Sequence, residues 1–277
     1  MTILDTHMHL VYPDRFDYPA ARGGDPELRA PSTYETYRAE AAALGIDRSI
    51  HMEVDVADEF IEAESEFVTG LAPSIVGAIS ACRPEREDFA EHLERVARNP
   101  KILGFRRVLH VQPVEIARAP LFVANVRRLA GRYTFDLCAL THQLPALAGL
   151  VRDCGDVTFV LDHLGIPEVG TRVWEPWASA VARLASFPNV SCKVSGFIAY
   201  SHPDAWSLDH LRPYFEHVIE LFGWDRVVWG SDWPICKRTA DLTQWVNVTH
   251  ALLAGCSDGE KVRLLHANAE RIYRIAN

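Results

Sequence analysis

The feature that most constrains the fold of this chain is the regular alternation of apolar, strand-like segments with amphipathic, helix-like ones. Strands are expected from Ile3 onward and over 48–55, 74–82, 102–109, 133–140, 157–161, 190–194 and 226–230. Helices are expected from a capping box at Ser32 and Glu35 to Leu44, and over 57–69, 87–98, 121–130, 144–151, 174–186 and 208–222, before two C-terminal helices. Eight strands alternating with helices predict an α/β chain folded as a (β/α)8 TIM barrel.

The length of 277 residues suits one such barrel. No linker-like composition, fixed-period repeat or low-complexity tract interrupts the sequence. One domain is therefore expected over residues 1–277, with an extra C-terminal helix that begins at a second capping box, Ser257 and Glu260. An open, doubly wound sheet is the alternative, but that fold would place a glycine-rich phosphate loop where His7 and His9 stand.

The net charge of −9 argues against a nucleic-acid-binding protein, which needs a basic face. None of the six cysteines forms a C-x-x-C pair, which favours reduced and mostly buried thiols. No secretory leader precedes His7, and no apolar run approaches the roughly 18 residues of a membrane span. We therefore expect a soluble, cytoplasmic protein that acts on a small molecule as a monomer or small homo-oligomer.

Two histidines end the first apolar segment. His7 and His9 are separated by one residue, and side chains that alternate along a strand would place both imidazoles on the same face. Such a pair is able to bind a metal ion or a substrate. Taken alone, an H-x-H pair is more often a surface or packing feature, so its meaning depends on the rest of the chain.

Polar residues gather where the other predicted strands end, and this is the end of a TIM barrel that carries active sites. Six of the eight strand ends carry ionisable groups, while the strand bodies are apolar. Besides the first pair, they include Arg106, Arg107, His110, His142, Asp162, His163, Lys193 and Asp232. Buried ionisable groups need a partner, a metal or a chemical role, so together these positions predict an active site.

Three motifs in this order resemble the amidohydrolase superfamily, and within it the amidohydrolase 2 branch of TIM-barrel sugar lactonases, which includes L-fuconolactonases and L-rhamnonolactonases. The motifs are Asp5-Thr6-His7-Met8-His9, Leu161-Asp162-His163-Leu164-Gly165 and Gly230-Ser231-Asp232-Trp233-Pro234. The resemblance covers the whole chain. It implies that His7, His9, His163 and Asp232 are metal ligands, and that Asp232 and His163 are catalytic, with Asp232 taking the proton of the attacking water.

The chain departs from the binuclear members of that superfamily on the fourth strand. Those members bridge two metals there with a carboxylated lysine or a glutamate, whereas this sequence has Arg106 and Arg107. A guanidinium stays protonated and cannot ligate a metal. We therefore expect one divalent ion, zinc in the first instance, or none.

The resemblance implies hydrolysis of a sugar-acid lactone, an ester-bond reaction on an aldono- or aldaro-lactone such as L-fucono- or L-rhamnono-lactone. Expected substrate-binding residues are Arg106, Arg107, His142, Lys193, Trp233 and Tyr12. Alternation along the fourth strand lets one of its two arginines point into the barrel and the other outward. Two other functions stay open, a metal-dependent non-oxidative decarboxylase and a non-catalytic barrel that binds a sugar acid.

Overall fold

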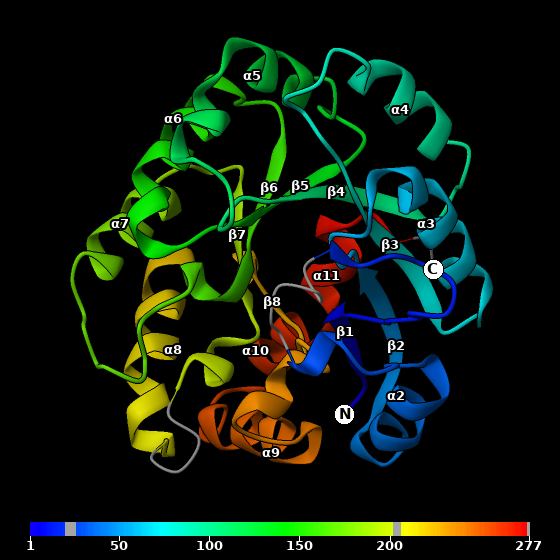
Figure 1. The fold of residues 1–277 in the computed structure, drawn as a ribbon. Coiled ribbons are helices and arrows are strands. Elements are labelled where there is room, and N and C mark those ends of the chain that lie inside the picture. The colour runs from blue at the N-terminus through cyan, green and yellow to red at the C-terminus, as the bar shows by residue number, and fades with distance from the viewer. Residues whose placement is uncertain (20–25, 202–205, 276–277) are drawn as a thin grey trace.

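Eight parallel strands form a nearly closed barrel in the computed structural model, which describes residues 1–19, 26–201 and 206–275 (Figure 1). The strands lie in sequence order, each hydrogen-bonded to the next. They are β1 (Ile3–Met8), β2 (Ile46–Met52), β3 (Ile75–Ala81), β4 (Ile102–Val108), β5 (Thr134–Cys138), β6 (Thr158–Leu161), β7 (Val190–Val194) and β8 (Val227–Trp229). The predicted (β/α)8 TIM barrel is confirmed.

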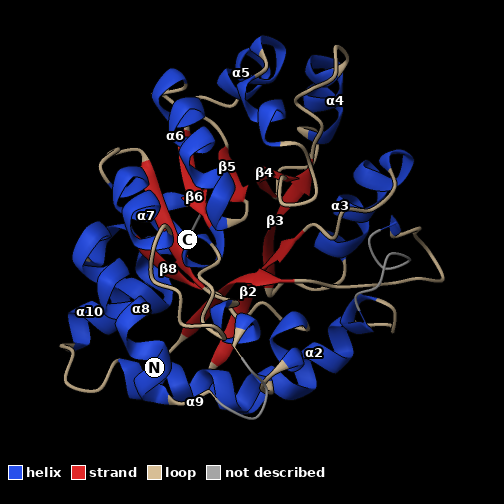
Figure 2. Cartoon of the chain, turned by 60° about the vertical axis from the view of Figure 1, so that its left-hand side comes forward, coloured by secondary structure: helices blue, strands red, loops and turns tan. Residues whose placement is uncertain are grey.

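Helices surround the barrel, and most of them cover the outer face of the strands (Figure 2). They are α2 (Tyr34–Ala41), α3 (Ile61–Gly70), α4 (Phe89–Val96), α5 (Pro120–Arg127), α6 (Leu144–Asp153), α7 (Trp177–Ala185), α8 (Leu208–Phe222), α9 (Leu242–Leu252), α10 (Asp258–Val262) and α11 (Asn268–Ile272). Within the described ranges, none of the helices is both long and apolar enough to cross a bilayer. The six cysteines are free thiols, and all but the half-buried Cys256 are buried.

The barrel closes where the first strand meets the segment that follows the last strand. Met8 forms a parallel bridge with Trp233 just beyond β8. The backbone N–H of His9 donates to the Trp233 carbonyl at 2.7 Å, and that of Asp232 donates to the His7 carbonyl at 2.7 Å. Main-chain hydrogen bonds therefore place the H-x-H pair beside Asp232, although more than 200 residues separate them in the sequence.

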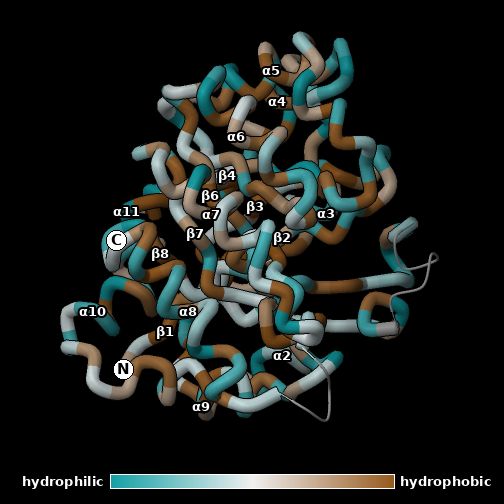
Figure 3. The backbone as a smooth tube through the Cα atoms, turned by 90° about the vertical axis from the view of Figure 1, so that its left-hand side faces the viewer, coloured by the Kyte–Doolittle hydropathy of each residue, from teal (hydrophilic) through white to brown (hydrophobic). Residues whose placement is uncertain are grey.

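Two apolar layers hold the barrel. The larger one packs the outer faces of the strands against the helices, and brown, apolar stretches run along the strands in Figure 3. The smaller layer contains Leu4, Ile50, Ile79, Val160 and Val228 together with Ala269, Ile272 and Tyr273 from the C-terminal segment. The C-terminal segment that contains α11 therefore helps to fill the middle of the ring (Figure 1).

Several predicted boundaries move by a few residues for local reasons. Ser32 was expected to cap α2, but its backbone pairs with Val11 in both directions, at 2.9 and 3.0 Å. Thr33 is the N-cap instead, and its hydroxyl accepts from the Thr36 N–H at 3.3 Å. The helix predicted from residue 174 begins at Trp177, directly after Pro176. A long loop was also predicted between the first strand and the first helix, and part of it, 20–25, lies outside the described residues.

The predicted capping box at the C-terminal end is confirmed. The Glu260 N–H donates to the Ser257 hydroxyl, and the Glu260 carboxylate accepts from the Ser257 N–H at 2.7 Å. The helix that begins there does not run on as regular α-helix. A π-helical turn over Arg263–Ala267 separates α10 from α11, and π turns are often found near functional sites.

Tyr273 connects this C-terminal segment to the polar interior of the barrel. Its ring is buried, and its hydroxyl donates to Asp136 Oδ2 on β5 at 3.1 Å. Tyr273→Phe is expected to lower the free energy of unfolding by about 1.5 kcal/mol, because the variant removes a buried hydrogen bond to a carboxylate. Urea denaturation measures this change.

Tyr214→Phe is the matched control. The Tyr214 ring packs against Trp174 and Trp177 outside the barrel, and the described residues place no carboxylate against its hydroxyl. Its loss should change stability by less than about 0.5 kcal/mol. Equal effects of the two substitutions would show that the Tyr273 hydroxyl has no special role in the barrel.

Candidate active site

A cavity of about 520 Å³ opens at the carboxyl ends of the strands. Its lining combines ionisable groups with apolar side chains. The ionisable ones are His9, Asp55, Arg106, His110, His163, Asp232 and Arg238, and the apolar ones include Val54, Val108, Leu140, Ile166 and Ile235. A concave site with mostly apolar walls and a few convergent polar groups is typical of a small-molecule binding site.

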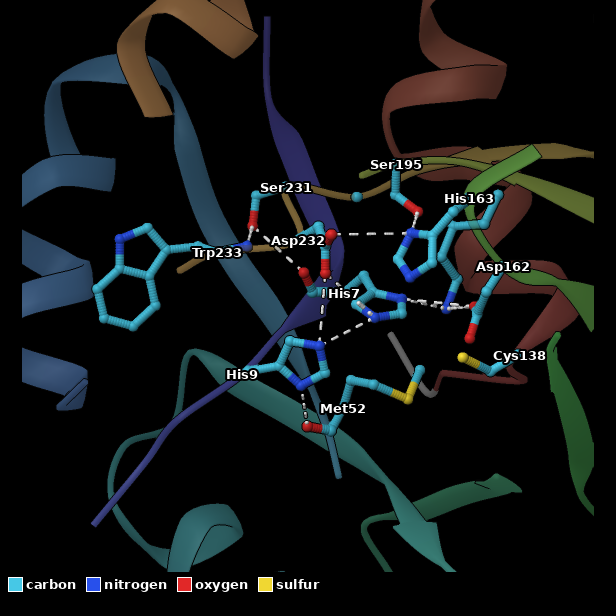
Figure 4. Close-up of polar contacts among 12 residues, drawn as sticks. His7, His9, Met52, Cys138, Asp162, His163, Ser195, Ser231, Asp232 and Trp233 are labelled. Atoms are coloured by element: carbon cyan, nitrogen blue, oxygen red, sulfur yellow. Dashed lines mark hydrogen bonds and ion pairs between the residues drawn. The ribbon is translucent and has the colours of Figure 1, made fainter. Parts of the chain in front are cut away.

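His7, His9 and Asp232 converge beside this cavity (Figure 4). The two Nε2 atoms are 3.2 Å apart, so the histidines share one face of the chain as predicted. Asp232 Oδ1 lies 3.6 Å from His7 Nε2 and 3.4 Å from His9 Nε2. These three separations are close to the distance between two ligand atoms in a tetrahedral zinc site, which is about 3.3 Å when the metal–ligand bonds are near 2.0 Å.

His163 lies on the other side of Asp232. Its Nδ1 is 4.0 Å from Asp232 Oδ2 and 3.0 Å from the Ser195 hydroxyl. It also belongs, with His7 and Asp162, to a second group whose ligand atoms could hold an ion. The structure thus brings all four predicted ligands together, but as a tight triangle of three with His163 displaced from it.

The backbone at these positions is strained. His163 and Asp232 have φ angles of 53° and 57°, and Leu164 and Ile166 have φ angles of 56° and 53°. The left-handed region is unfavourable for side chains other than glycine, and residues forced into it gather at functional sites. Trp177 anchors the first of these turns, because its indole N–H donates to the Leu164 carbonyl at 2.7 Å.

Three buried charged groups form an ionic network beneath the triangle. Lys193 Nζ lies 2.7 Å from Asp136 Oδ2 and 2.9 Å from Asp162 Oδ1, and 3.1 Å from His7 Nδ1. Burial alone would raise the pKa of Asp162, but Lys193 and His7 outweigh it and hold that pKa well below the ordinary value. Burial, reinforced by Lys193, holds the pKa of His7 well below its usual range. His7 is therefore neutral, which is the form that binds a metal.

Arg106 adds a fixed positive charge at the edge of the cavity. Its Nε donates to Glu53 Oε1 at 2.6 Å and its Nη2 donates to the Glu53 carbonyl at 2.7 Å. The remaining nitrogen, Nη1, lies 3.4 Å from both His7 Nε2 and Asp162 Oδ2. Because Glu53 holds two of its three nitrogens, the guanidinium cannot move far from this position.

The residues fit a divalent cation. Asp232 Oδ2 is buried and has no hydrogen-bond partner among the described residues, which is costly for a carboxylate without a cation. Buried carboxylates near the triangle include Glu53, Asp136, Asp162 and Asp232, and the nearby buried cations are Lys193 and Arg106. A divalent ion held by His7, His9 and Asp232 would add positive charge beside the Asp232 carboxylate.

Two predicted substrate-binding residues are held away from the cavity by ion pairs. Lys193 is fully buried within the network beneath the triangle. Arg107, next to the inward-facing Arg106, turns outward and lies 2.8 Å from Glu85 and 3.7 Å from Asp55. Alternation along β4 therefore separates the two arginines, and neither Lys193 nor Arg107 lines the cavity.

Three further predicted substrate-binding residues lie around rather than in the cavity. The Trp233 indole is buried against Tyr37, and its N–H donates to Glu40 at 3.2 Å. The Tyr12 hydroxyl accepts from the Tyr34 N–H at 3.0 Å. His142 lines an adjoining hollow of about 380 Å³, which shares Leu140, Ile166 and Tyr200 with the main cavity.

Sequence reasoning missed Glu53, Asp136, Tyr200 and Arg238. Asp136 could have been found, because it is the only carboxylate within an apolar strand, 134–138, and a buried carboxylate needs a cationic partner. Glu53, directly after an apolar stretch, gives a weaker signal of the same kind. Tyr200 and Arg238 lie in short 3-10 segments and carry no comparable sequence signal. Only the folded loops bring them to the cavity.

Comparison with known proteins finds relatives that are named as lactonases. A curated relative, the L-fucono-1,5-lactonase of Burkholderia ambifaria, is 31% identical over 219 residues, which cover 75% of this chain and 72% of the relative. The L-rhamnono-gamma-lactonase of Scheffersomyces stipitis is 26% identical over 200 residues, 63% of this chain and 59% of the relative.

Solved structures share the fold. An amidohydrolase from Burkholderia multivorans, crystallised with bound zinc, superposes with a TM-score of 0.88 at 22% identity, and 100% of each chain is covered. The family model described as amidohydrolase matches residues 4–275, nearly the whole sequence. This chain therefore belongs to the amidohydrolase family.

Proposed function

We propose that this protein is a hydrolase that opens a sugar-acid lactone by attack of water on the lactone carbonyl. The observation that carries the proposal is the position of the Asp232 carboxylate. One of its oxygens contacts His7 and His9, and the other is buried without a hydrogen-bond partner among the described residues. Asp232 also lines the cavity, where its carboxylate would take a proton from a bound water.

Asp232 acts as the general base in this proposal. Positioned acid–base groups of this kind typically contribute about 10²–10⁴-fold to the rate. A divalent ion bound by His7, His9 and Asp232, zinc in our proposal, would polarise the lactone carbonyl and lower the pKa of a bound water. His163 lines the same cavity from the far side of Asp232, where its imidazole can donate a hydrogen bond to the substrate.

Arg106 supplies positive charge where the reaction develops negative charge. As the lactone carbonyl is attacked, its oxygen becomes an oxyanion, and fixed cationic donors stabilise that charge. Arg106 Nη1 lies 3.4 Å from His7 Nε2, at the edge of the ligand triangle. The apolar walls at Val54, Val108 and Leu140 would contact the sugar ring carbons.

The relatives support this choice of reaction over its alternatives. The names of two curated relatives describe lactonases that act on L-fucono-1,5-lactone and on L-rhamnono-gamma-lactone. We therefore assign aldonolactones as the first substrates to test. A metal-dependent decarboxylase or a non-catalytic sugar-acid-binding barrel would have the same fold. A substrate screen distinguishes both from a lactonase.

A screen with a pH indicator tests the reaction, because opening of a lactone releases one acid equivalent. L-Fucono-, L-rhamnono- and other aldono- and aldaro-lactones should be assayed with zinc and with a chelator. We expect acid release from at least one aldonolactone. Carbon dioxide release from a carboxylic acid would instead indicate a decarboxylase, and ligand binding without turnover would indicate a non-catalytic barrel.

Asp232→Asn should lower kcat by at least about 10³-fold, because the amide cannot accept the proton from water. The steady-state rate on the best lactone of the screen measures this effect. Asp225→Asn is the matched control, since the Asp225 side chain is 82% exposed and pairs only with Arg263 at 3.6 Å in the described structure. A rate close to that of the wild type for Asp232→Asn would exclude the general-base role.

Gly196 provides the space that Asp232 and His163 need. Its φ angle is 60°, and a Cβ atom built there would lie 2.4 Å from both Asp232 Oδ2 and His163 Nδ1. Gly196→Ala should therefore displace both side chains and lower kcat/KM by at least about 10²-fold, the loss expected for a misplacement of roughly 1 Å. Far-UV circular dichroism should stay unchanged.

Gly149→Ala is the matched control for this substitution. A Cβ atom at Gly149, on α6, would meet nothing within 4 Å. The alanine should leave kcat/KM unchanged and should slightly raise stability, because glycine is unfavourable inside a helix. Normal activity of Gly196→Ala would mean that the observed positions of Asp232 and His163 are not required for turnover.

A further inference from the structure

His7 is contacted by opposing hydrogen-bonding groups at both of its ring nitrogens. At Nδ1 the neighbours are Lys193 Nζ at 3.1 Å, which can only donate, and Asp162 Oδ1 at 3.4 Å, which can only accept. At Nε2 the neighbours include His9 Nε2 at 3.2 Å and Asp232 Oδ1 at 3.6 Å. A neutral imidazole carries one N–H. If the proton is on Nδ1, His7 can donate to Asp162 but cannot accept from Lys193. If the proton is on Nε2, His7 can accept from Lys193 and donate to His9 or Asp232.

A hydrogen bond fixes the tautomer of His9, and this tautomer determines which kind of group His9 presents to His7 Nε2. His9 Nδ1 lies 2.9 Å from the Met52 carbonyl, which can only accept a hydrogen bond. A neutral His9 ring therefore carries its proton on Nδ1, and its Nε2 presents a lone pair to His7 Nε2. Asp232 Oδ1 presents a second acceptor to the same atom.

Two arrangements of His7 follow. If Lys193 donates to His7 Nδ1, the proton of His7 sits on Nε2 and points at His9 and Asp232, and a metal cannot use that atom. If Asp162 accepts from His7 Nδ1–H, then Nε2 is bare, and three acceptor atoms face one another as a metal requires. The proton moves from one ring nitrogen to the other, and the site neither gains nor loses a proton.

We propose that Lys193 is the positioning residue that controls metal binding, because its hydrogen bond to His7 Nδ1 holds His7 in the tautomer that cannot ligate. Metal binding then requires that His7 exchange Lys193 for Asp162 as its Nδ1 partner. The alternative partner is already in place, since Asp162 Oδ1 lies 2.9 Å from Lys193 Nζ and 3.4 Å from His7 Nδ1.

Other groups around Lys193 support this assignment. Burial works against its charge, but Asp136 and Asp162 outweigh burial and raise the pKa of Lys193, so that it remains a donor. Arg106 Nη1 is a donor on the opposite side, 3.4 Å from His7 Nε2. That contact is longer than the one from Lys193, and Asp162 Oδ2 lies at the same distance from the same nitrogen. Lys193 therefore decides the tautomer.

Nitrogen NMR on the wild-type protein tests the proposal without any variant of Lys193. Histidine labelled with ¹⁵N in the ring reports which nitrogen carries the proton, and His7→Gln identifies the signals of His7 among the 12 histidines. Without metal we expect the proton on Nε2, and after addition of zinc we expect it on Nδ1. A proton on Nδ1 in the metal-free protein would overturn the proposal.

Zinc affinity gives a second readout that does not depend on any enzymatic activity. Lys193→Met should bind zinc at least about tenfold more tightly than the wild type in competition with a chromophoric chelator, a change typical of groups that orient a metal ligand. Lys237→Met is the control for net charge, because Lys237 pairs with Glu40 next to Trp233 and does not contact His7. Equal gains in the two variants would contradict the proposal. If Lys193→Met does not fold, the NMR measurement on the wild type decides.

Discussion

The seam between β1 and β8 is the constraint on which the site depends. Asp5 Oδ1 accepts from the backbone N–H of both His7, at 3.0 Å, and Ser231, at 2.8 Å. With the main-chain hydrogen bonds between residues 7–9 and 232–233, this carboxylate fixes β1 in register with the segment that follows β8. His7, His9 and Asp232 come together because the barrel closes at this seam. The same hydrogen bonds therefore hold both the fold and the candidate site.

The interior of the barrel is charged where most protein cores are apolar. A buried ion pair stabilises a fold only weakly, because desolvation offsets the attraction between its members. The network of Lys193, Asp136 and Asp162 is therefore better explained by its effect on the protonation of His7 than by a contribution to the stability of the fold. Tyr273 extends the network to the C-terminal segment, which links the last helix of the chain to the first strand.

The barrel could be predicted from the sequence. The four predicted ligands could also be named in advance, and the fold brings them together, but several of the residues around them could not be predicted. Periodicity predicted the order of strands and helices, and strand alternation predicted that His7 and His9 share a face. It also allowed only one of Arg106 and Arg107 to point inward. Alternation does not predict which ion-pair partner a side chain will have. Lys193 was therefore expected to bind the substrate, whereas ion pairs with Asp136 and Asp162 hold it beneath the cavity.

The central claim is that water attacks the carbonyl carbon of a lactone at Asp232, and hydrolysis in H₂¹⁸O tests it most directly. The product of the best lactone should be analysed by mass spectrometry after a single turnover. Attack on the carbonyl places one ¹⁸O atom in the new carboxylate and leaves the released hydroxyl unlabelled. Label in the hydroxyl, or a product that has lost its carboxyl carbon as carbon dioxide, would contradict the account.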